Sequence, residues 1–459
     1  MSLTLPVRNA SGSSRAHSLL PATMTDQAIT RAIADPLLRR GAGRGWWIAF
    51  AFALLGAFAM VATMALVFMR GIGVLGNNTN VVWGVPIANY VWWIGIGNAG
   101  TLISALLLLT RQDWRASINR FAETMTLFAV AIAGLFPILH LGRPQYFYWL
   151  FPYPNSMTLW PQWRSALVWD FWAILSYLLF SIVFWYAGML PDLATFRDRA
   201  ESRRAQLVYG ALALGWRGSA SQWRAHRMFY TTMAALAVPL VCSVHSIVGL
   251  DFAASLMPGW QETIFPPYFV VGAMFSGFAM VVILAAALRQ GFRYEALLTP
   301  RHFEAMAIII LASSLIMTLA YATEWFNGWY SGKSAERGEV AFSFTGTYAL
   351  LFYAQLLCNC LLPQILWWPT LRRRLIPLVL VSFGVLVGMW LERILIIWNT
   401  LSRGYLASAR QTFHMTGADW SLLLSPLGLF AFLFLITVRV LPSISMHEVK
   451  ELRHEEAQS

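Results

Sequence analysis

Ten apolar stretches, each about as long as a bilayer is thick, recur along this chain. A helix needs roughly 20 apolar residues to cross the hydrocarbon core of a membrane. Strands of a membrane barrel would instead alternate in polarity, whereas stretches such as residues 51–69 are apolar on every side. The pattern predicts an all-α polytopic membrane protein with about ten transmembrane helices. The predicted spans are Trp46–Met69, Trp83–Leu109, Phe121–Leu141, Ala166–Gly188, Met228–Val248, Pro267–Leu288, Glu304–Trp325, Tyr348–Trp368, Pro377–Ile397 and Trp420–Val440.

Composition supports the same class. Of the 459 residues, 58% are hydrophobic and only 12% are charged, and the mean hydropathy is +0.58. A soluble domain typically has about 25% charged residues. The first 45 residues are polar and contain no short apolar core ahead of a cleavage site. We therefore expect a disordered or surface-lying tail there and no signal peptide.

Positive residues predict the orientation of the helices. Most of the 33 Lys and Arg residues lie in segments on the same side as the N-terminus, with dense groups at 197–227 and 372–374. Because cytoplasmic loops carry the excess of Lys and Arg, both termini are predicted to be cytoplasmic. The net charge of +12 is then explained by topology and anionic lipid, and a nucleic-acid partner is not needed.

A faint internal repeat predicts how the helices are grouped. Arg120, Glu123 and Met125 at the start of the third span recur as Arg301, Glu304 and Met306 at the start of the seventh. Four spans separate the copies, so both share one orientation, which predicts two parallel four-helix bundles and two peripheral helices. The expected divisions are a tail (1–45), a peripheral helix and loop (46–82), a first bundle (83–252), a second bundle (253–400) and an outer loop with a peripheral helix and tail (401–459).

Four ionisable residues lie at helix ends that this topology places on the outer face. His140 ends the third helix, Asp170 begins the fourth, and His245 and Asp251 end the fifth. A lone histidine near a helix end is often only a capping group, but ionisable groups within membrane segments are costly and usually functional. Two histidines and two aspartates at one depth therefore favour a functional pocket. The second helix adds Asn89, Trp92, Trp93 and Asn98 at the same level.

The loop after the third span carries the most specific sequence pattern. Gly142-Arg143-Pro144 leads into YFYWLFPYPN and LWPQWRSALVWD, and later runs are HSIVGLDFA, PGWQETIFPPYF, EWFNGWYSG and CNCLLPQILWW. Over roughly residues 46–440, these runs resemble the NrfD/PsrC family of quinone-interacting membrane subunits. Within that family, the chain most closely resembles the ActC type found in bacterial alternative complex III. The loop at 406–415 and Gly249 depart from the family pattern, which puts partner contacts at that loop in doubt.

The resemblance implies a quinol-oxidising subunit in the bacterial inner membrane, with menaquinol or ubiquinol as its substrate. It implies an extracytoplasmic iron-sulfur partner that receives the electrons, a homologous NrfD-like membrane subunit and cytochrome c subunits. No bound metal or haem is expected in this chain. His140, Asp170 and Asp251 map onto the quinol pocket, and a histidine can accept a phenolic proton at physiological pH. Further quinol-binding candidates are His245, Asn89, Trp93 and Tyr146.

A proton route is a further hypothesis. The resemblance implies one through Glu324, Glu392 and Arg393 in the second bundle. Tyr177 shares a helix face with Asp170, but such polar residues serve equally as hydrogen-bonding contacts between helices. Glu392 and Arg393 are sequence neighbours and do not share a helix face, so we expect each to pair with another helix and not with each other.

Other function classes remain open from the residues. A di-haem cytochrome needs two inward His pairs, whereas only two histidines lie within spans, both near one face. A secondary transporter favours a midplane site, and a passive anchor has little need for buried His and Asp. The alternatives kept are a quinone-reducing membrane anchor of a molybdoenzyme of the polysulfide reductase type, and a transporter. The quinone type and the direction of electron flow do not follow from the sequence.

Overall fold

Most of the described part of the chain consists of long apolar helices. The computed structural model describes residues 19–21, 23–39, 41–152 and 161–458. Ten helical segments in it are long and apolar enough to cross a membrane, as predicted. They are formed by α2 (Arg44–Arg70), α3 (Val85–Leu109), α4 (Asn119–Ala133) with α5 (Phe136–Leu139), α6 (Ala166–Arg199), α8 (Ala220–Ala253), α9 (Phe265–Gly291), α10 (Pro300–Tyr330), α12 (Ala349–Leu356) with the turns that follow it, α14 (Leu375–Ser402) and α15 (Gly417–Val440).

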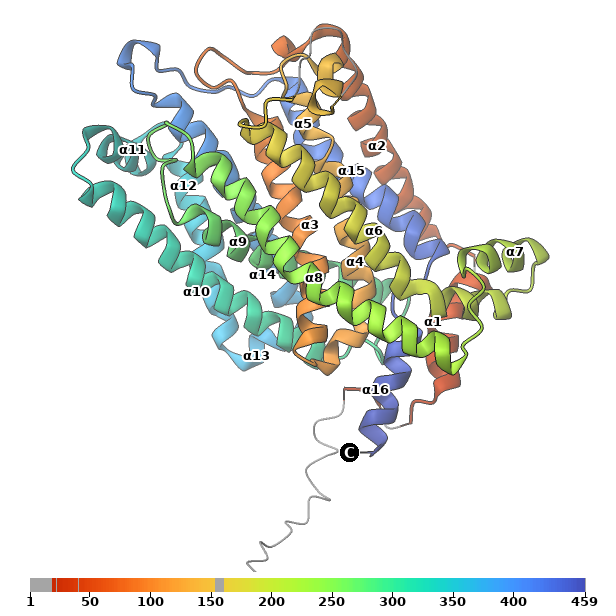
Figure 1. Ribbon diagram of the computed structural model, residues 1–459. Coiled ribbons are helices and arrows are strands. Elements are labelled where there is room, and N and C mark those ends of the chain that lie inside the picture. The colour runs from red at the N-terminus through yellow and green to blue at the C-terminus, as the bar shows by residue number, and fades with distance from the viewer. Residues whose placement is uncertain (1–18, 22, 40, 153–160, 459) are drawn as a thin grey trace, which may run out of the picture.

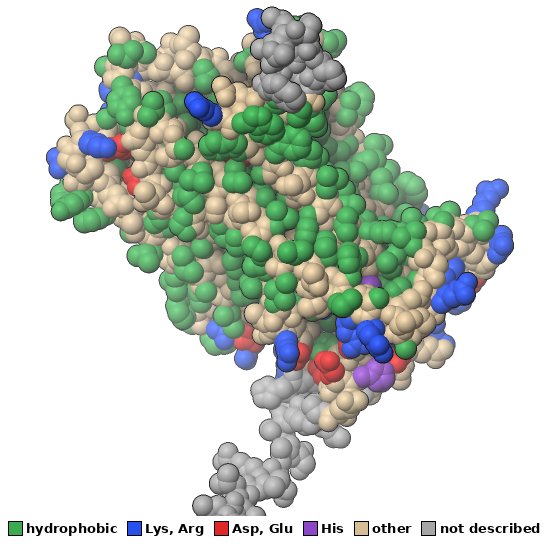
Figure 2. All heavy atoms as spheres, viewed as in Figure 1, with side chains coloured by type: hydrophobic (Ala, Val, Ile, Leu, Met, Phe, Trp, Pro, Cys, Tyr) green, Lys and Arg blue, Asp and Glu red, His purple; other side chains and the backbone are tan. Residues whose placement is uncertain are grey.

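Shorter helices close the two ends of the bundle. They are α1 (Asp26–Leu38), α7 (Arg203–Leu212), α11 (Ser334–Thr345), α13 (Pro369–Arg372) and α16 (Met446–Gln458). In Figure 1, α5 and α11 lie at the upper end, whereas α1, α13 and α16 lie at the lower end. Figure 2 shows apolar side chains along the flank between these ends and charged side chains gathered mostly at the lower end. This distribution is typical of a protein whose flank is covered by lipid.

Helix α3 is the centre of the fold. It packs against α4, α8, α9 and α14, and almost all of its residues are buried. Glycines let the neighbouring backbones come close: a Cβ atom added at Gly100 would lie 2.0 Å from the carbonyl oxygen of Ala122, and one at Gly277 would lie 1.8 Å from the Cβ of Ala99. Small residues at such crossings are the usual device for packing membrane helices tightly.

Other helices surround α3 on two sides. Helices α4, α6 and α8 lie on one side of α3, and α9, α10, α12 and α14 follow on the other, with α9 touching both groups. Helices α2 and α15 pack against each other along one flank. The repeat relation between the two groups stays a prediction. The repeated residues differ in their surroundings, because Arg120 is completely buried whereas Arg301 is exposed.

The lower end is more ordered than the sequence pattern indicated. Residues 26–38 form α1, whose Ile29 and Ile33 are fully buried, and α1 packs against α16 and α6. Helices α6 and α8 also continue about ten residues beyond their predicted limits. Hydropathy misses such extensions because these turns carry charged residues that pack against other helices instead of lipid. Residues 1–18 of the expected tail lie outside the described residues.

Substitution of Gly56 tests the packing of α2 against α15. A Cβ atom at Gly56 would lie 2.6 Å from the Cα of Gly428 on α15. Because backbone atoms cannot rotate away, Gly56→Val should separate the helices and cost about 1–3 kcal/mol of stability. The thermal unfolding midpoint of the purified protein measures this loss. Ala51→Val, on the exposed face of the same helix, is the control and should leave the midpoint unchanged; equal midpoints for both variants would refute the packing.

Candidate functional site

Breaks and ends of helices place the predicted pocket residues at the upper end of the first bundle. Helix α4 ends at Gly134, and the short helix α5, with Pro137 in its first turn, ends at His140. Asp170 lies in the second turn of α6, and Asp251 lies in the last turn of α8. Three separate helices therefore carry these side chains, and those of Asp170 and Asp251 lie close together.

A tyrosine joins these residues in the pocket. The carboxyl groups of Asp170 and Asp251 lie close to each other, and the hydroxyl of Tyr90 on α3 lies close to Asp170, but neither contact has hydrogen-bond geometry. The ring of Tyr90 also meets that of His140 edge to face, with 6.1 Å between centroids. His140, Asp170 and Tyr90 are at most 7% exposed. Tyr90 was not among the predicted site residues, because a tyrosine in an apolar helix with many aromatic residues gives no distinctive signal.

Several buried polar atoms of this pocket lack a hydrogen-bond partner among the described residues. They are both ring nitrogens of His140, one carboxylate oxygen of Asp170, both carboxylate oxygens of Asp251 and the hydroxyl of Tyr90. Buried polar atoms are nearly always paired, and leaving one unpaired costs about 1–3 kcal/mol. Donors and acceptors gathered here from four helices are therefore suited to bind a ligand that carries hydroxyl or carbonyl groups.

His245 lies one to two turns deeper along α8. Its Nδ1 is 2.6 Å from the amide nitrogen of Asn98, and its Nε2 has no partner among the described residues. Its ring faces that of Phe269 on α9, with 6.3 Å between centroids. His245 is therefore held between α3 and α9 and is separate from the pair of carboxyl groups.

Two predicted pocket residues face a different part of the protein. The Asn89 amide donates to the Leu422 carbonyl oxygen at 2.7 Å and accepts from the Trp390 indole at 2.9 Å. The Trp93 ring packs against Trp92 and Phe430. Asn89 therefore connects α3 to α14 and α15, and Trp93 connects α3 to α15.

The aromatic loop above the pocket is described in part. Tyr146 is half-buried and stacks on Trp149, with 4.8 Å between ring centroids. Residues 153–160 of the same loop lie outside the described residues. Tyr146 thus belongs to an aromatic layer at the upper end of the molecule.

The second bundle contains an ion pair that the sequence argument did not expect. Arg393 lies 2.8 Å from Glu392, and both side chains are almost completely buried. The expectation that these neighbours would not pair is wrong, because a long arginine side chain can bend back around its own helix where no water competes for it. The guanidinium also lies 4.0 Å from the ring centroid of Phe269, so α9 holds it in place. The other oxygen of Glu392 accepts a hydrogen bond from Tyr321.

A small acidic cavity of about 50 Å³ borders this ion pair, with Glu392 in its lining. Its lining includes Glu324 together with Glu262, Glu336 and Glu339 from the connecting segments. Burial, reinforced by Glu336, raises the pKa of Glu339 to about 7. Burial and the same neighbour also raise the pKa of Glu262. The cavity therefore holds at least one carboxyl group, that of Glu339, whose pKa lies near neutral pH.

Tyr177 lies on the buried face of α6 that the sequence predicted. Asp170, Tyr177 and Ser181 are each at most 3% exposed. The Tyr177 hydroxyl donates to the Gly97 carbonyl oxygen at 3.1 Å. This bond ties α6 to α3, as expected for a polar contact between membrane helices.

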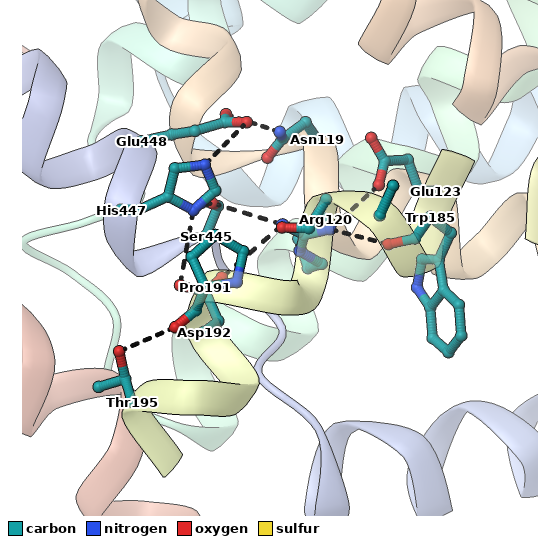
Figure 3. Close-up of polar contacts among 12 residues, drawn as sticks. Asn119, Arg120, Glu123, Trp185, Pro191, Asp192, Thr195, Ser445, His447 and Glu448 are labelled. Carbon is teal, nitrogen blue, oxygen red and sulfur yellow. Dashed lines mark hydrogen bonds and ion pairs between the residues drawn. The ribbon is translucent and has the colours of Figure 1, made fainter. Parts of the chain in front are cut away.

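A buried charge cluster at the lower end was missed as a site. Arg120 is its centre: its guanidinium lies 3.4 Å from Glu123 and 3.7 Å from Asp192, and donates to the Gly188 carbonyl oxygen at 2.6 Å (Figure 3). Asn119 donates to Glu448 on α16 at 2.7 Å. We call Asn119, Arg120, Glu123, Asp192 and Glu448 the Arg120 cluster. The sequence contains one signal of this cluster, the opposite charges of Arg120 and Glu123 three positions apart in an apolar helix. In the sequence alone this pair indicates only the internal repeat.

Comparison with known proteins identifies the family. A family model described as "Polysulphide reductase, NrfD" matches residues 73–403. The chain belongs to this family. It is 26% identical over 249 residues to a putative membrane subunit of dimethyl sulfoxide reductase from Halobacterium salinarum, covering 53% of this chain and 51% of that protein. It is 23% identical over 424 residues to a subunit of selenate reductase from Mesobacillus selenatarsenatis, covering 85% of this chain and 93% of that protein.

The matches bear on the expected function in two ways. Both relatives are named as subunits of reductases. The chain itself is an NrfD-family member whose described residues form ten helices long and apolar enough to span a membrane. The match spans about half the length of the Halobacterium protein. The particular resemblance to the ActC type of alternative complex III is not supported by these matches.

Among the described residues, no group of three or more His, Cys, Asp or Glu is arranged to hold a metal ion.

Removal of Arg120 tests whether the lower cluster holds the fold together. Arg120→Met leaves Glu123 and Asp192 buried without their cation, so it should cost about 3–5 kcal/mol of stability. A thermal unfolding scan of the purified protein would show the loss as a lower midpoint. Arg203→Met, on the exposed surface of α7, should not change the midpoint. A midpoint for Arg120→Met equal to that of the control would contradict a stabilising role.

The raised pKa of Glu339 predicts a pH dependence of stability. Its pKa rises from 4.5 to about 7 on folding, so the folded protein holds a proton that the unfolded chain releases between these values. Stability should therefore decrease as the pH rises through this interval. Glu339→Gln should flatten the plot of unfolding midpoint against pH, whereas Arg337→Gln on the same helix should keep its slope. Parallel plots for wild type and Glu339→Gln would disprove the assignment.

Proposed function

We propose that this NrfD-family chain oxidises quinol in the upper pocket and is the membrane subunit of a molybdoenzyme-type reductase complex. Membrane subunits of this family bind quinone. The names of its relatives, a dimethyl sulfoxide reductase subunit and a selenate reductase subunit, favour this function over a role in alternative complex III. In this proposal an iron-sulfur partner covers the upper end and takes the electrons, and other membrane subunits complete the assembly.

The unpaired polar atoms of the pocket carry the proposal. A quinol presents two hydroxyl groups on an apolar ring, and the pocket offers the His140 ring nitrogens and the Asp251 oxygens without other partners among the described residues. Tyr90 adds a hydroxyl and an aromatic face at the same place. A ring bound there would satisfy atoms that otherwise remain buried and unpaired.

The chemistry requires acceptors for two protons. Oxidation of one quinol to the quinone releases two electrons and two protons. His140 is placed to accept one hydroxyl proton, and the neighbouring carboxyl groups of Asp170 and Asp251 are placed to share and pass on the other. The electrons leave to the partner's iron-sulfur centre. In this proposal the other candidates have supporting roles. His245 orients the lower wall of the pocket, Asn89 and Trp93 fix the position of α3, and Tyr146 covers the ring of the bound quinol.

The proposal includes a proton route through the second bundle. Glu392, paired with Arg393 and bonded to Tyr321, lines the same acidic cavity as Glu324. These groups would connect the upper surface to the middle of the second bundle.

The proposal also places the chain in a bacterial cytoplasmic membrane. Both termini would lie on the cytoplasmic side, because the positive residues gather at the lower end.

Substitution of the proton acceptors tests the proposal. His140→Ala and Asp170→Asn should each lower quinol-dependent reductase activity of the assembled complex by about 100-fold or more, because general base catalysis is lost. His454→Ala and Asp198→Asn, exposed at the lower end, are matched controls that should retain activity. Equal amounts of assembled complex must be compared. Full activity in both pocket variants would defeat the assignment.

The choice of electron acceptor separates the two kinds of complex. A molybdoenzyme-type reductase should couple quinol oxidation to reduction of an oxygen-bearing acceptor such as a sulfoxide or an oxyanion. A complex of the alternative complex III type should instead reduce a c-type cytochrome. The same quinol assay with the two acceptors decides between them.

A further inference from the structure

A wide cavity lies at the lower end, far from the quinol pocket. It has a volume of about 1190 Å³ and lies between the end of α6, the start of α8 and α16. The Arg120 cluster forms part of its inner wall through Asp192 and Glu448 (Figure 3). Neither the proposed quinol chemistry nor the electron transfer uses this cavity.

Each acidic residue of this cavity has a cationic partner within the protein. Asp192 contacts Arg120, which it shares with Glu123; Glu448 pairs with Arg115, Asp198 with Arg197, Asp26 with Arg453 and Glu451 with Arg227. Three lining cations form no side-chain hydrogen bond or ion pair with another described residue, namely Arg217, Arg224 and Lys450. Lys450 interacts electrostatically with Asp26 and Asp192, so the positive charge of Arg217 and Arg224 in particular favours an anionic ligand.

The flanking residues place the cavity at the depth of lipid headgroups. Trp216 and Trp223 line it with their rings edge to face, and tryptophan is typical of the membrane interface. One turn beyond Arg224 on α8, Met228 is 69% exposed and Phe229 is 45% exposed, so the surface becomes apolar there. On the other side, Leu214 after α7 is 70% exposed. A molecule bound to the cations would thus have apolar surface beside it for acyl chains.

We propose that this cavity is a binding site for the phosphate headgroup of an anionic phospholipid, with Arg217, Arg224 and Lys450 as its ligands. The position of the site on the predicted cytoplasmic side agrees, since anionic lipids are concentrated in that leaflet. Bound there, a lipid joins α8 to α16 and so supports the Arg120 cluster from outside. The proposal does not depend on the assignment of the quinol pocket.

Lipid titration of the purified full chain tests the site. Native mass spectrometry from a neutral detergent should show cardiolipin or phosphatidylglycerol retained on the wild-type protein and phosphatidylcholine lost. The double variant Arg217→Gln/Arg224→Gln should bind the anionic lipids about 30-fold more weakly, because each arginine near a lipid surface contributes roughly 1 kcal/mol. The matched control Arg203→Gln/Arg204→Gln removes the same charge from the exposed surface of α7 and should bind as wild type does.

Three results would overturn the proposal. Equal weakening in both double variants would mean that general surface charge attracts the lipid. Unchanged binding in the cavity variant would place the lipid elsewhere. Displacement of the lipid by millimolar inorganic phosphate, with equal thermal protection by phosphate alone, would show that the cavity takes a free anion and not a headgroup. The four replaced arginines are all exposed, so the variants should fold, and equal unfolding midpoints without lipid confirm it.

Discussion

Polar and charged groups that enter an apolar helix bundle must find partners inside the protein, and this constraint organises both ends of the molecule. At the lower end the constraint is met around Arg120, which contacts two carboxylates and the backbone of α6. In the second bundle it is met by Glu392 and Arg393 pairing with each other. In both places, charges that would be costly in lipid become contacts that fix one helix against another.

The upper pocket differs from these two places. Some buried atoms of the Arg120 cluster, such as the oxygens of Asp192, also lack a hydrogen bond, but their charged groups form ion pairs. Among the described residues no ion pair reaches Asp170 or Asp251, and His140, Asp251 and Tyr90 bring unpaired donors and acceptors to one place. Because an unpaired buried group costs stability, this concentration favours a role in binding, whereas the ion pairs below favour a structural role. Charged residues of the same types thus serve the fold at one end and, in our proposal, chemistry at the other. The NrfD-family membership agrees with a quinone ligand for the unpaired set.

Hydropathy predicted the spans because lipid requires apolar length, and all ten are confirmed. It also predicted the level of His140, Asp170 and Asp251, because that level depends only on where each helix begins or ends. The contact partners of individual side chains could not be predicted from hydropathy. Tyr90 lies in the pocket, and Asn89 bonds to α14 and α15. These contacts depend on how α3 is rotated and which helices surround it, and hydropathy encodes neither.

Covalent labelling by a photoreactive quinone tests most directly whether the unpaired groups form a quinol site. The purified chain would be illuminated with an azido-quinone, and the labelled peptides mapped by mass spectrometry. The account predicts label on the segments around Tyr90, His140 and Asp251, with competition by unlabelled quinol. Label confined to the lower cavity between α8 and α16, or spread over the flank without competition, would contradict it.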